Sequence, residues 1–185
     1  QLTSTSITSR QDVGDATLTL STRPFDERIP LDGKLVMQGL NVAPFKPLSP
    51  AIRTLTGMLN GDVSISGYVE DPALNGELSI SNGAIDIQDT PVTLADWNQK
   101  VMLNGQTAAL DGTFVLGGGK GALKGELDWS SNPSATFNLK GNGFEIRQPN
   151  IRLKVSPNID IAATKEKVDV NGEVNIPWAR IEIES

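Results

Sequence analysis

The sequence predicts an elongated all-β protein built on a mostly antiparallel sheet, with one short helix. Apolar and polar side chains alternate with a period of two along much of the chain, which is typical of strands with one face toward an apolar interior. Asn-Gly and Asp-Gly pairs, which favour tight turns, separate these runs. Hydrophobic residues make up 38% of the 185 residues but aromatic residues only 5%, so the interior must be built from Val, Ile and Leu.

The strands are expected where this alternation is clearest, between residues 62 and 87, 123 and 140, 151 and 155, and 168 and 176. Successive side chains of a strand point to opposite faces, so each run has one apolar and one polar face. The apolar side chains are therefore expected on one common inward face, which lines either a core or a groove. This predicted lining consists of Val63, Ile65, Leu78, Ile80, Ile85, Ile87, Leu123, Leu127, Phe137, Leu139, Ile151, Leu153, Val168, Val170, Val174 and Ile176.

The turns are expected at pairs that supply positive φ angles. These pairs predict a meander of hairpins, and some of their glycines are expected in bulges instead. They are Asn60-Gly61, Asn75-Gly76, Asn82-Gly83, Asn104-Gly105, Asn142-Gly143, Asn171-Gly172, Asp32-Gly33 and Asp111-Gly112.

The one helix is expected between Ser49 and Leu59, where Ile52, Leu55 and Leu59 fall at helical spacing. Ser49 can cap its start and Pro50 suits its first position. No apolar run approaches the 18 residues of a membrane span, so we expect this segment not to cross a membrane. We interpret residues 1–185 as a single β-rich segment of a longer, repeat-like domain, because the alternation persists through Ile181, Glu182, Ile183 and Glu184.

The composition excludes several kinds of site within this chain. There is no cysteine and no histidine, so disulfides, the usual zinc sites and Ser-His or Cys-His catalytic pairs are excluded. A net charge of −6 and a pI near 4.7 argue against nucleic acid as a partner. We predict no catalytic residue, no cofactor, no metal site and no enzymatic activity.

Two motifs have ordinary structural interpretations. The glycine cluster between Gly117 and Gly121 lacks the strand-turn-helix context of a nucleotide site, and it predicts a turn or a close backbone crossing. Carboxylates recur on the expected polar faces, where they are typical of a solvated surface. These are Asp62, Glu77, Asp86, Glu126, Asp128 and Glu173.

The apolar face must be covered, and one short helix cannot cover it. Either the sheet curls until its apolar sides meet, as in a sandwich or filled barrel, or it curls only partly and leaves a trough for a guest. The pattern alone favours the closed core. Trp97, Trp129 and Trp178 are either rim anchors or packing residues, and Trp129 and Trp178 share the parity of the inward residues.

Residues 61–87 (GDVSISGYVEDPALNGELSISNGAIDI) and 112–137 (GTFVLGGGKGALKGELDWSSNPSATF) resemble the C-terminal region of the TamB family of AsmA-like proteins. The resemblance implies a U-shaped sheet with a hydrophobic interior, called a β-taco, and so favours the trough. It implies a periplasmic body whose inner-membrane anchor lies outside this chain. It also implies a partner, the outer-membrane barrel TamA, contacted through regions at or beyond the end of the chain.

For function, the resemblance implies a subunit of the translocation and assembly module. Its hydrophobic groove would serve outer-membrane protein (autotransporter) assembly, phospholipid transport between the inner and outer membranes, or both. The guests would be phospholipid acyl chains or unfolded outer-membrane protein strands. Two alternatives remain open. One is a strand-donating scaffold that pairs a sheet edge, at 168–176 or 181–183, with a barrel partner. The other is a structural domain with a closed core.

Overall fold

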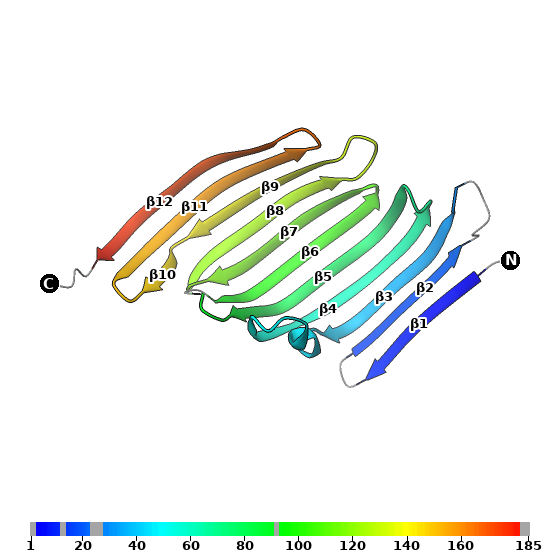
Figure 1. The fold of residues 1–185 in the computed structure, drawn as a ribbon, viewed down its shortest axis with the longest axis horizontal. Helices are drawn as coiled ribbons and strands as arrows, with labels where there is room; N and C mark the ends of the chain where they lie inside the picture. Colours follow the sequence, from blue (N-terminus) through cyan, green and yellow to red (C-terminus); the bar gives the residue numbers. More distant parts are fainter. Residues whose placement is uncertain (1–2, 12–13, 23–27, 91–92, 182–185) are drawn as a thin grey trace.

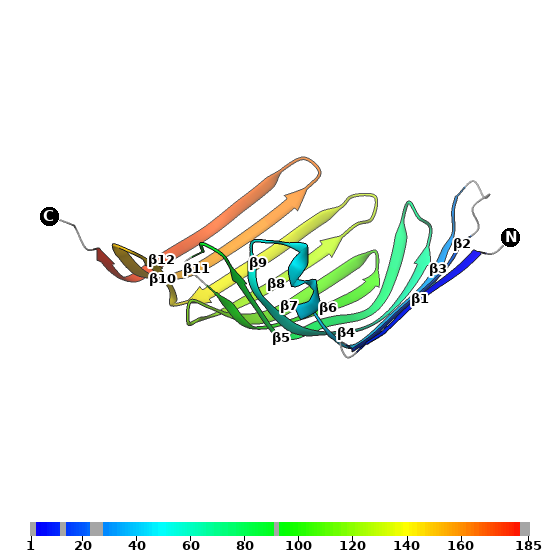
Figure 2. The ribbon, with the colours of Figure 1, turned by 60° about the horizontal axis from the view of Figure 1, so that its bottom comes forward.

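The chain forms one curled antiparallel sheet of 12 strands in a single layer, which confirms the all-β prediction (Figures 1 and 2). The computed structural model describes residues 3–11, 14–22, 28–90 and 93–181. The strands are β1 Thr3–Gln11, β2 Gly14–Thr22, β3 Leu31–Asn41, β4 Ile52–Gly67, β5 Pro72–Ile87, β6 Leu94–Gly105, β7 Thr107–Leu116, β8 Gly119–Asp128, β9 Ser134–Asn142, β10 Phe144–Gln148, β11 Ile151–Thr164 and β12 Val168–Ile181.

The topology is a meander in which each strand from β1 to β9 pairs with the next. β11 then pairs with β9 through its second half and with β10 through its first half. Gly143, at φ +67°, separates β9 from β10, so these two strands act as one interrupted strand beside β11. β12 pairs with β11, and β1 and β12 are the two edges of an open sheet (Figure 1).

The register places apolar side chains of neighbouring strands directly opposite one another, on one face of the sheet. We call this the apolar face and the other the polar face. One row crosses the sheet from β2 to β12 without a charged side chain. Its members are Leu18, Leu35, Val63, Gly76, Leu103, Ala108, Leu127, Ala135, Ala163 and Val168.

The helix expected between Ser49 and Leu59 is wrong, because β4 occupies this segment from Ile52 onward. Ile52 pairs with Ile87 and Leu55 with Ile85, and the register shifts between them around Arg53. This irregularity brings two side chains that are three residues apart to the same face, which imitates helical spacing. The helical turn that exists is a short 3-10 helix, η1, at Ala43–Leu48, which contains Pro44 and Pro47.

The turn predictions hold only in part. Asn104-Gly105 ends β6 at the tight connection to β7, with Gly105 at φ +65°. Asn82-Gly83 forms a bulge in β5, and Asn142-Gly143 lies at the break between β9 and β10. The remaining pairs lie inside β3, β4, β5, β7 and β12, where the hairpin prediction is wrong.

Gly117 lies at the turn between β7 and β8, and its carbonyl accepts the Glu145 N–H at 3.2 Å, so it is both a turn and a backbone crossing.

Glycines inside the strands make room for large side chains on the apolar face. A Cβ built on Gly61 would lie 2.5 Å from Leu78 Cδ2, and one built on Gly125 would lie 2.6 Å from Phe137 Cδ1. Real Cβ atoms do not approach this closely, so each large side chain lies over the glycine of the neighbouring strand. The residues that precede these two glycines, Asn60 and Lys124, face the polar side.

The structure contradicts the closed core. Within the described residues, the only hydrophobic side chains that are buried are Val42, Val63, Ala108 and Phe144, and none is fully enclosed. The sheet does not meet itself, and the described part contains no second layer of secondary structure over the apolar face (Figure 2).

The apolar face, the rim and the edges of the sheet

The predicted lining residues lie on the apolar face in five of the six strands that carry them. Val63 pairs with Gly76, Leu78 with Gly61, and Leu127 with Ala108. In β5 the parity changes, since Ile80 is even and Ile85 and Ile87 are odd. The bulge at Asn82-Gly83 absorbs this change, so that Ile80 opposite Leu59 and Ile85 opposite Leu55 face the same way.

β12 departs from its predicted pattern. Val168, Val170 and Val174 pair with Ala163, Ile161 and Pro157 on the apolar face. The register then shifts, and Trp178 pairs with Lys154. Trp178 therefore lies on the polar face, which corrects the parity assigned to it, and Ile176 lies within the irregularity. The bulge adds one residue that the alternation alone does not reveal.

The sequence pattern missed β6 and β7, which lie in the middle of the sheet. Val101 and Leu103 of β6, and Ala108 and Leu110 of β7, continue the apolar face between β5 and β8. The alternation is weak here because Met102 and Ala109, on the polar face, are also apolar. Gln99 interrupts the face: it is only 8% exposed, and its side chain lies over Gly112. Its Nε2 donates to the Lys100 carbonyl at 3.3 Å.

Two aromatic rings pack at the end of the apolar face near the β7–β8 turn. Phe114 of β7 and Phe144 of β10 have ring centroids 5.8 Å apart. Phe144 is 4% exposed and lies over Gly121 and Gly141. These rings pack on each other on the apolar face, and the alternation of apolar and polar residues gives no sign of their contact.

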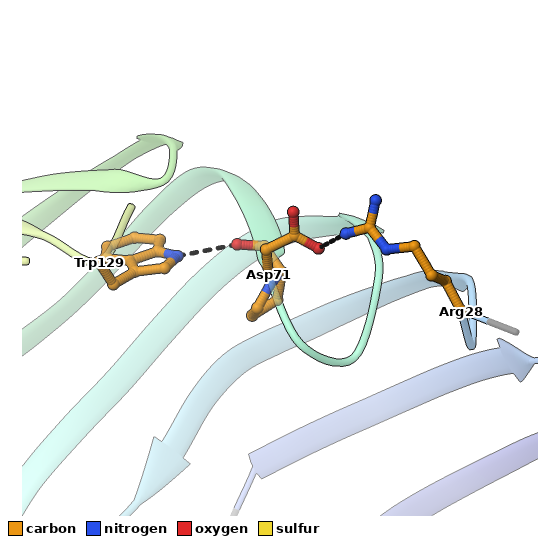
Figure 3. A network of polar contacts seen from close by, with 4 residues as sticks. Arg28, Asp71 and Trp129 are labelled. Carbon is orange, nitrogen blue, oxygen red and sulfur yellow. Dashed lines mark hydrogen bonds and ion pairs between the residues drawn. The ribbon is translucent and has the colours of Figure 1, made fainter. Parts of the chain in front are cut away.

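The opposite end of the strands is tied together by Trp129, which follows β8 (Figure 3). Its indole Nε1–H donates to the Pro72 carbonyl at the start of β5, at 2.8 Å, although β6 and β7 lie between these strands. Asp71 next to Pro72 accepts from Arg28 at 2.6 Å, and the Arg28 guanidinium lies 4.0 Å from the Tyr68 ring centre. Trp129 thus links β5 and β8 at the rim of the sheet through its indole N–H. Trp97 is half-buried in β6 and packs on Gly83.

The polar face carries ion pairs between neighbouring strands. Lys34 pairs with Asp62 at 3.1 Å, Lys100 with Glu77 at 3.0 Å, and Lys124 with Asp111 at 3.3 Å. Such exposed pairs contribute little stability each. Two shallow depressions of about 590 and 740 Å³ lie on this face, the first over β6 to β12 and the second over β6 to β9. Both are open to solvent, and the paired Lys124 and Asp111 line the first, so neither is an enclosed binding site.

Two carboxyl groups have shifted pKa values. The Asp128 carboxylate accepts hydrogen bonds from Ser130, which lower its pKa below the usual value. The Arg147 hydrogen bond lowers the pKa of Glu145, and the charges of Lys154 and Arg152 add to this effect. In the part of the chain that the structure describes, no three acidic side chains are grouped closely enough to hold a metal ion.

No helix among the described residues is long and apolar enough to cross a membrane. Residues 182–185, which include part of the second candidate edge at 181–183, lie outside the described residues.

Comparisons with known proteins agree on one family. The family model described as "TamB, N-terminal domain" matches residues 1–80, and that described as "TamB C-terminal domain" matches residues 109–185. The chain is 30% identical over 158 residues to the translocation and assembly module subunit TamB of Haemophilus influenzae. This match covers 84% of the chain but only 12% of that protein. No solved structure matches. The curled, unclosed sheet and these matches together assign the chain to the TamB family.

Proposed function

We propose that this chain forms part of the periplasmic body of a translocation and assembly module subunit, and that its apolar face is a trough for a hydrophobic guest. The guest is the acyl chains of phospholipids moving between the inner and outer membranes, or the unfolded strands of outer-membrane proteins such as autotransporters. The body would be anchored in the inner membrane by a segment outside this chain, and TamA would be its barrel partner. The observation that carries the proposal is an apolar face that runs from β2 to β12 and that no second layer covers in the described part of the chain.

The chemistry of this face suits acyl chains. The predicted lining is aliphatic except for Phe137. Contacts between aliphatic groups are not directional, so such a surface can bind a guest in either direction and in any register. Burying a Val, Leu or Ile side chain completely is worth roughly 1.5–3 kcal/mol, so completing the burial of a half-exposed one is worth on the order of 1 kcal/mol. A guest that covers about ten such side chains therefore gains enough to offset the loss of freedom on binding.

The test is photo-crosslinking in cells. A photoreactive residue replaces Leu78 or Leu127, on the apolar face, and the matched controls replace Glu77 or Glu126, one residue earlier on the polar face. Phospholipid captured only from the apolar positions supports the lipid-carrying trough. Outer-membrane protein captured only from those positions supports a role in chaperoning strands. Equal capture from both faces, or no capture from the apolar positions of a folded protein, would refute the trough.

A second candidate function rests on β12. This edge strand pairs only with β11, and Val168, Val170 and Val174 are 66%, 63% and 54% exposed, more than the aliphatic side chains on the apolar face of β2 to β11. Long exposed apolar edges tend to pair with another strand. A photoreactive residue at Val170 should then capture the barrel partner where one at Leu78 does not. Partner capture from both positions, or from neither, would count against strand pairing at this edge.

A further inference from the structure

β10, β11 and β12 form a three-stranded tip of the sheet (Figures 1 and 2). The polar face of this tip carries an unusual concentration of positive charge. Arg147, Arg152 and Arg180 lie directly opposite one another in one row across the three strands. The next row along contains Glu145, Lys154 and Trp178. Four cations and one carboxylate therefore share a small exposed area, in a chain whose net charge is −6.

Elsewhere on the polar face three lysines pair with acids of neighbouring strands, whereas in the tip three arginines lie directly opposite one another, and like charges in this arrangement destabilise a sheet. Glu145 binds Arg147 through both oxygens, at 2.8 and 3.1 Å. Arg180 also interacts with another group of the protein. Within the described residues, Arg152 and Lys154 form no ion pair, so they are the cations on which an anionic ligand is expected to depend. Glu182 and Glu184 follow Arg180 in the sequence and lie outside those residues.

The other face of the same tip is apolar and exposed. Ile151 pairs with Ile181 at the very end, and they are 38% and 67% exposed. Trp178, on the basic face, is 44% exposed. Along a strand each residue rises roughly 3.3 Å, so the arginine row lies about 3 Å behind the isoleucines and Lys154 about 10 Å behind them. The polar zone on each side of a bilayer is roughly 5–7 Å thick, which matches this spacing of apolar tip and cations.

We propose that the β10–β12 tip docks on the surface of a membrane that contains anionic phospholipid, with Ile151 and Ile181 entering the acyl boundary and Arg152 and Lys154 at the phosphates. Trp178 lies at the depth that indole rings favour in membrane interfaces. An acidic protein surface would account for the cations but not for the aliphatic side chains exposed at the same tip. This docking is independent of whether the apolar face carries a guest.

The test measures binding of the 185-residue chain to vesicles of phosphatidylcholine alone and of equimolar phosphatidylcholine and phosphatidylglycerol. We expect binding to the mixed vesicles only, and we expect it to weaken as salt is added. The double variant R152Q/K154Q should bind about 25-fold more weakly, because each cation near an anionic surface contributes about fivefold. The matched variant K100Q/K124Q removes the same charge from the middle of the polar face and should change binding by no more than about twofold.

Contact at the tip is checked by quenching of tryptophan fluorescence with brominated phospholipid in the same mixed vesicles. Quenching should be lost in W178F and retained in W129F. Three results would each overturn the proposal: equal binding to neutral and mixed vesicles, binding to neither, or equal weakening by the two double variants. Binding to polyglutamate without binding to vesicles would assign the patch to an acidic protein instead. All substituted positions of the double variants are exposed, and circular dichroism confirms that each variant folds.

Discussion

Gly121 of β8 tests whether glycine is required beneath the large side chains of the apolar face. A Cβ added there would lie 2.5 Å from Phe114 Cε2 and 2.9 Å from Phe144 Cζ. These rings pack on each other, so neither ring can retreat alone. Gly121 is not among the glycines at positive φ, so alanine there strains packing rather than backbone. Overpacking lowers the free energy of unfolding by about 1–3 kcal/mol. Replacing glycine by alanine also restricts the unfolded chain, which raises the free energy of unfolding by about 0.4–1 kcal/mol.

We therefore expect Gly121→Ala to lower the free energy of unfolding by about 0.5–2 kcal/mol in urea titrations followed by circular dichroism. Phe114→Leu should make room for the methyl group, so the double variant should lose less than the sum of the single variants, with a coupling of about 1 kcal/mol. The control is Gly118→Ala, at φ +76° with nothing within 4 Å of the added Cβ. Its strain is in the backbone, so Phe114→Leu should not relieve it. A Gly121→Ala protein as stable as the parent, or equal coupling for both glycines, would refute the packing argument.

Two further predictions concern the rim of the sheet. Trp129→Phe keeps an aromatic ring but removes the hydrogen-bond donor to the Pro72 carbonyl. This substitution should lower the midpoint of urea unfolding by an amount equivalent to about 1–2 kcal/mol. An unchanged midpoint would show that the hydrogen bond does not hold β5 and β8 together. Hydrogen bonds from Ser130 lower the pKa of Asp128 in the folded state, so its contribution to stability is present above the ordinary carboxyl pKa and is lost as pH falls through the lowered value. Asp128→Asn should remove that part of the acid dependence in urea titrations at a series of pH values, whereas an unaltered pH profile would contradict it.

The sequence predicted strands after residue 62, where apolar and polar residues alternate most clearly, but it assigned none to β1, β2 or β3. Leu123 and Leu139, which the alternation places on the inward face, lie opposite each other. The pattern failed at irregularities in two strands, β4 and β12. The bulge near Arg53 made β4 resemble a helix, and the one before Trp178 reversed the face of that side chain. A bulge adds a residue without adding an apolar or polar signal, so only the register of the neighbouring strand reveals it.

The turn residues failed for a different physical reason. The Asn-Gly and Asp-Gly pairs that end in Gly33, Gly61, Gly76, Gly112 and Gly172 predict hairpins, but these glycines lie inside strands. Large side chains such as Leu78 and Phe137 lie over Gly61 and Gly125, and close backbone approach accounts for Gly76 and Gly172. The group that requires space above each glycine belongs to the adjacent strand, which is a separate segment of the sequence. A single sequence therefore gives the same dipeptide whether glycine is needed for a turn or for packing.

The gradient of exposure across the apolar face follows from the same packing. A central strand is shielded on both sides, so side chains such as Val101 and Leu110 are half-buried even without a second layer. β12 has a neighbour on one side only, and its valines are more than half exposed although they belong to the same rows. An added strand would bury them to the level of the central strands and would leave the apolar face as open as before. Closing the edge and covering the face are thus separate requirements, because a strand added at the edge leaves the apolar face uncovered.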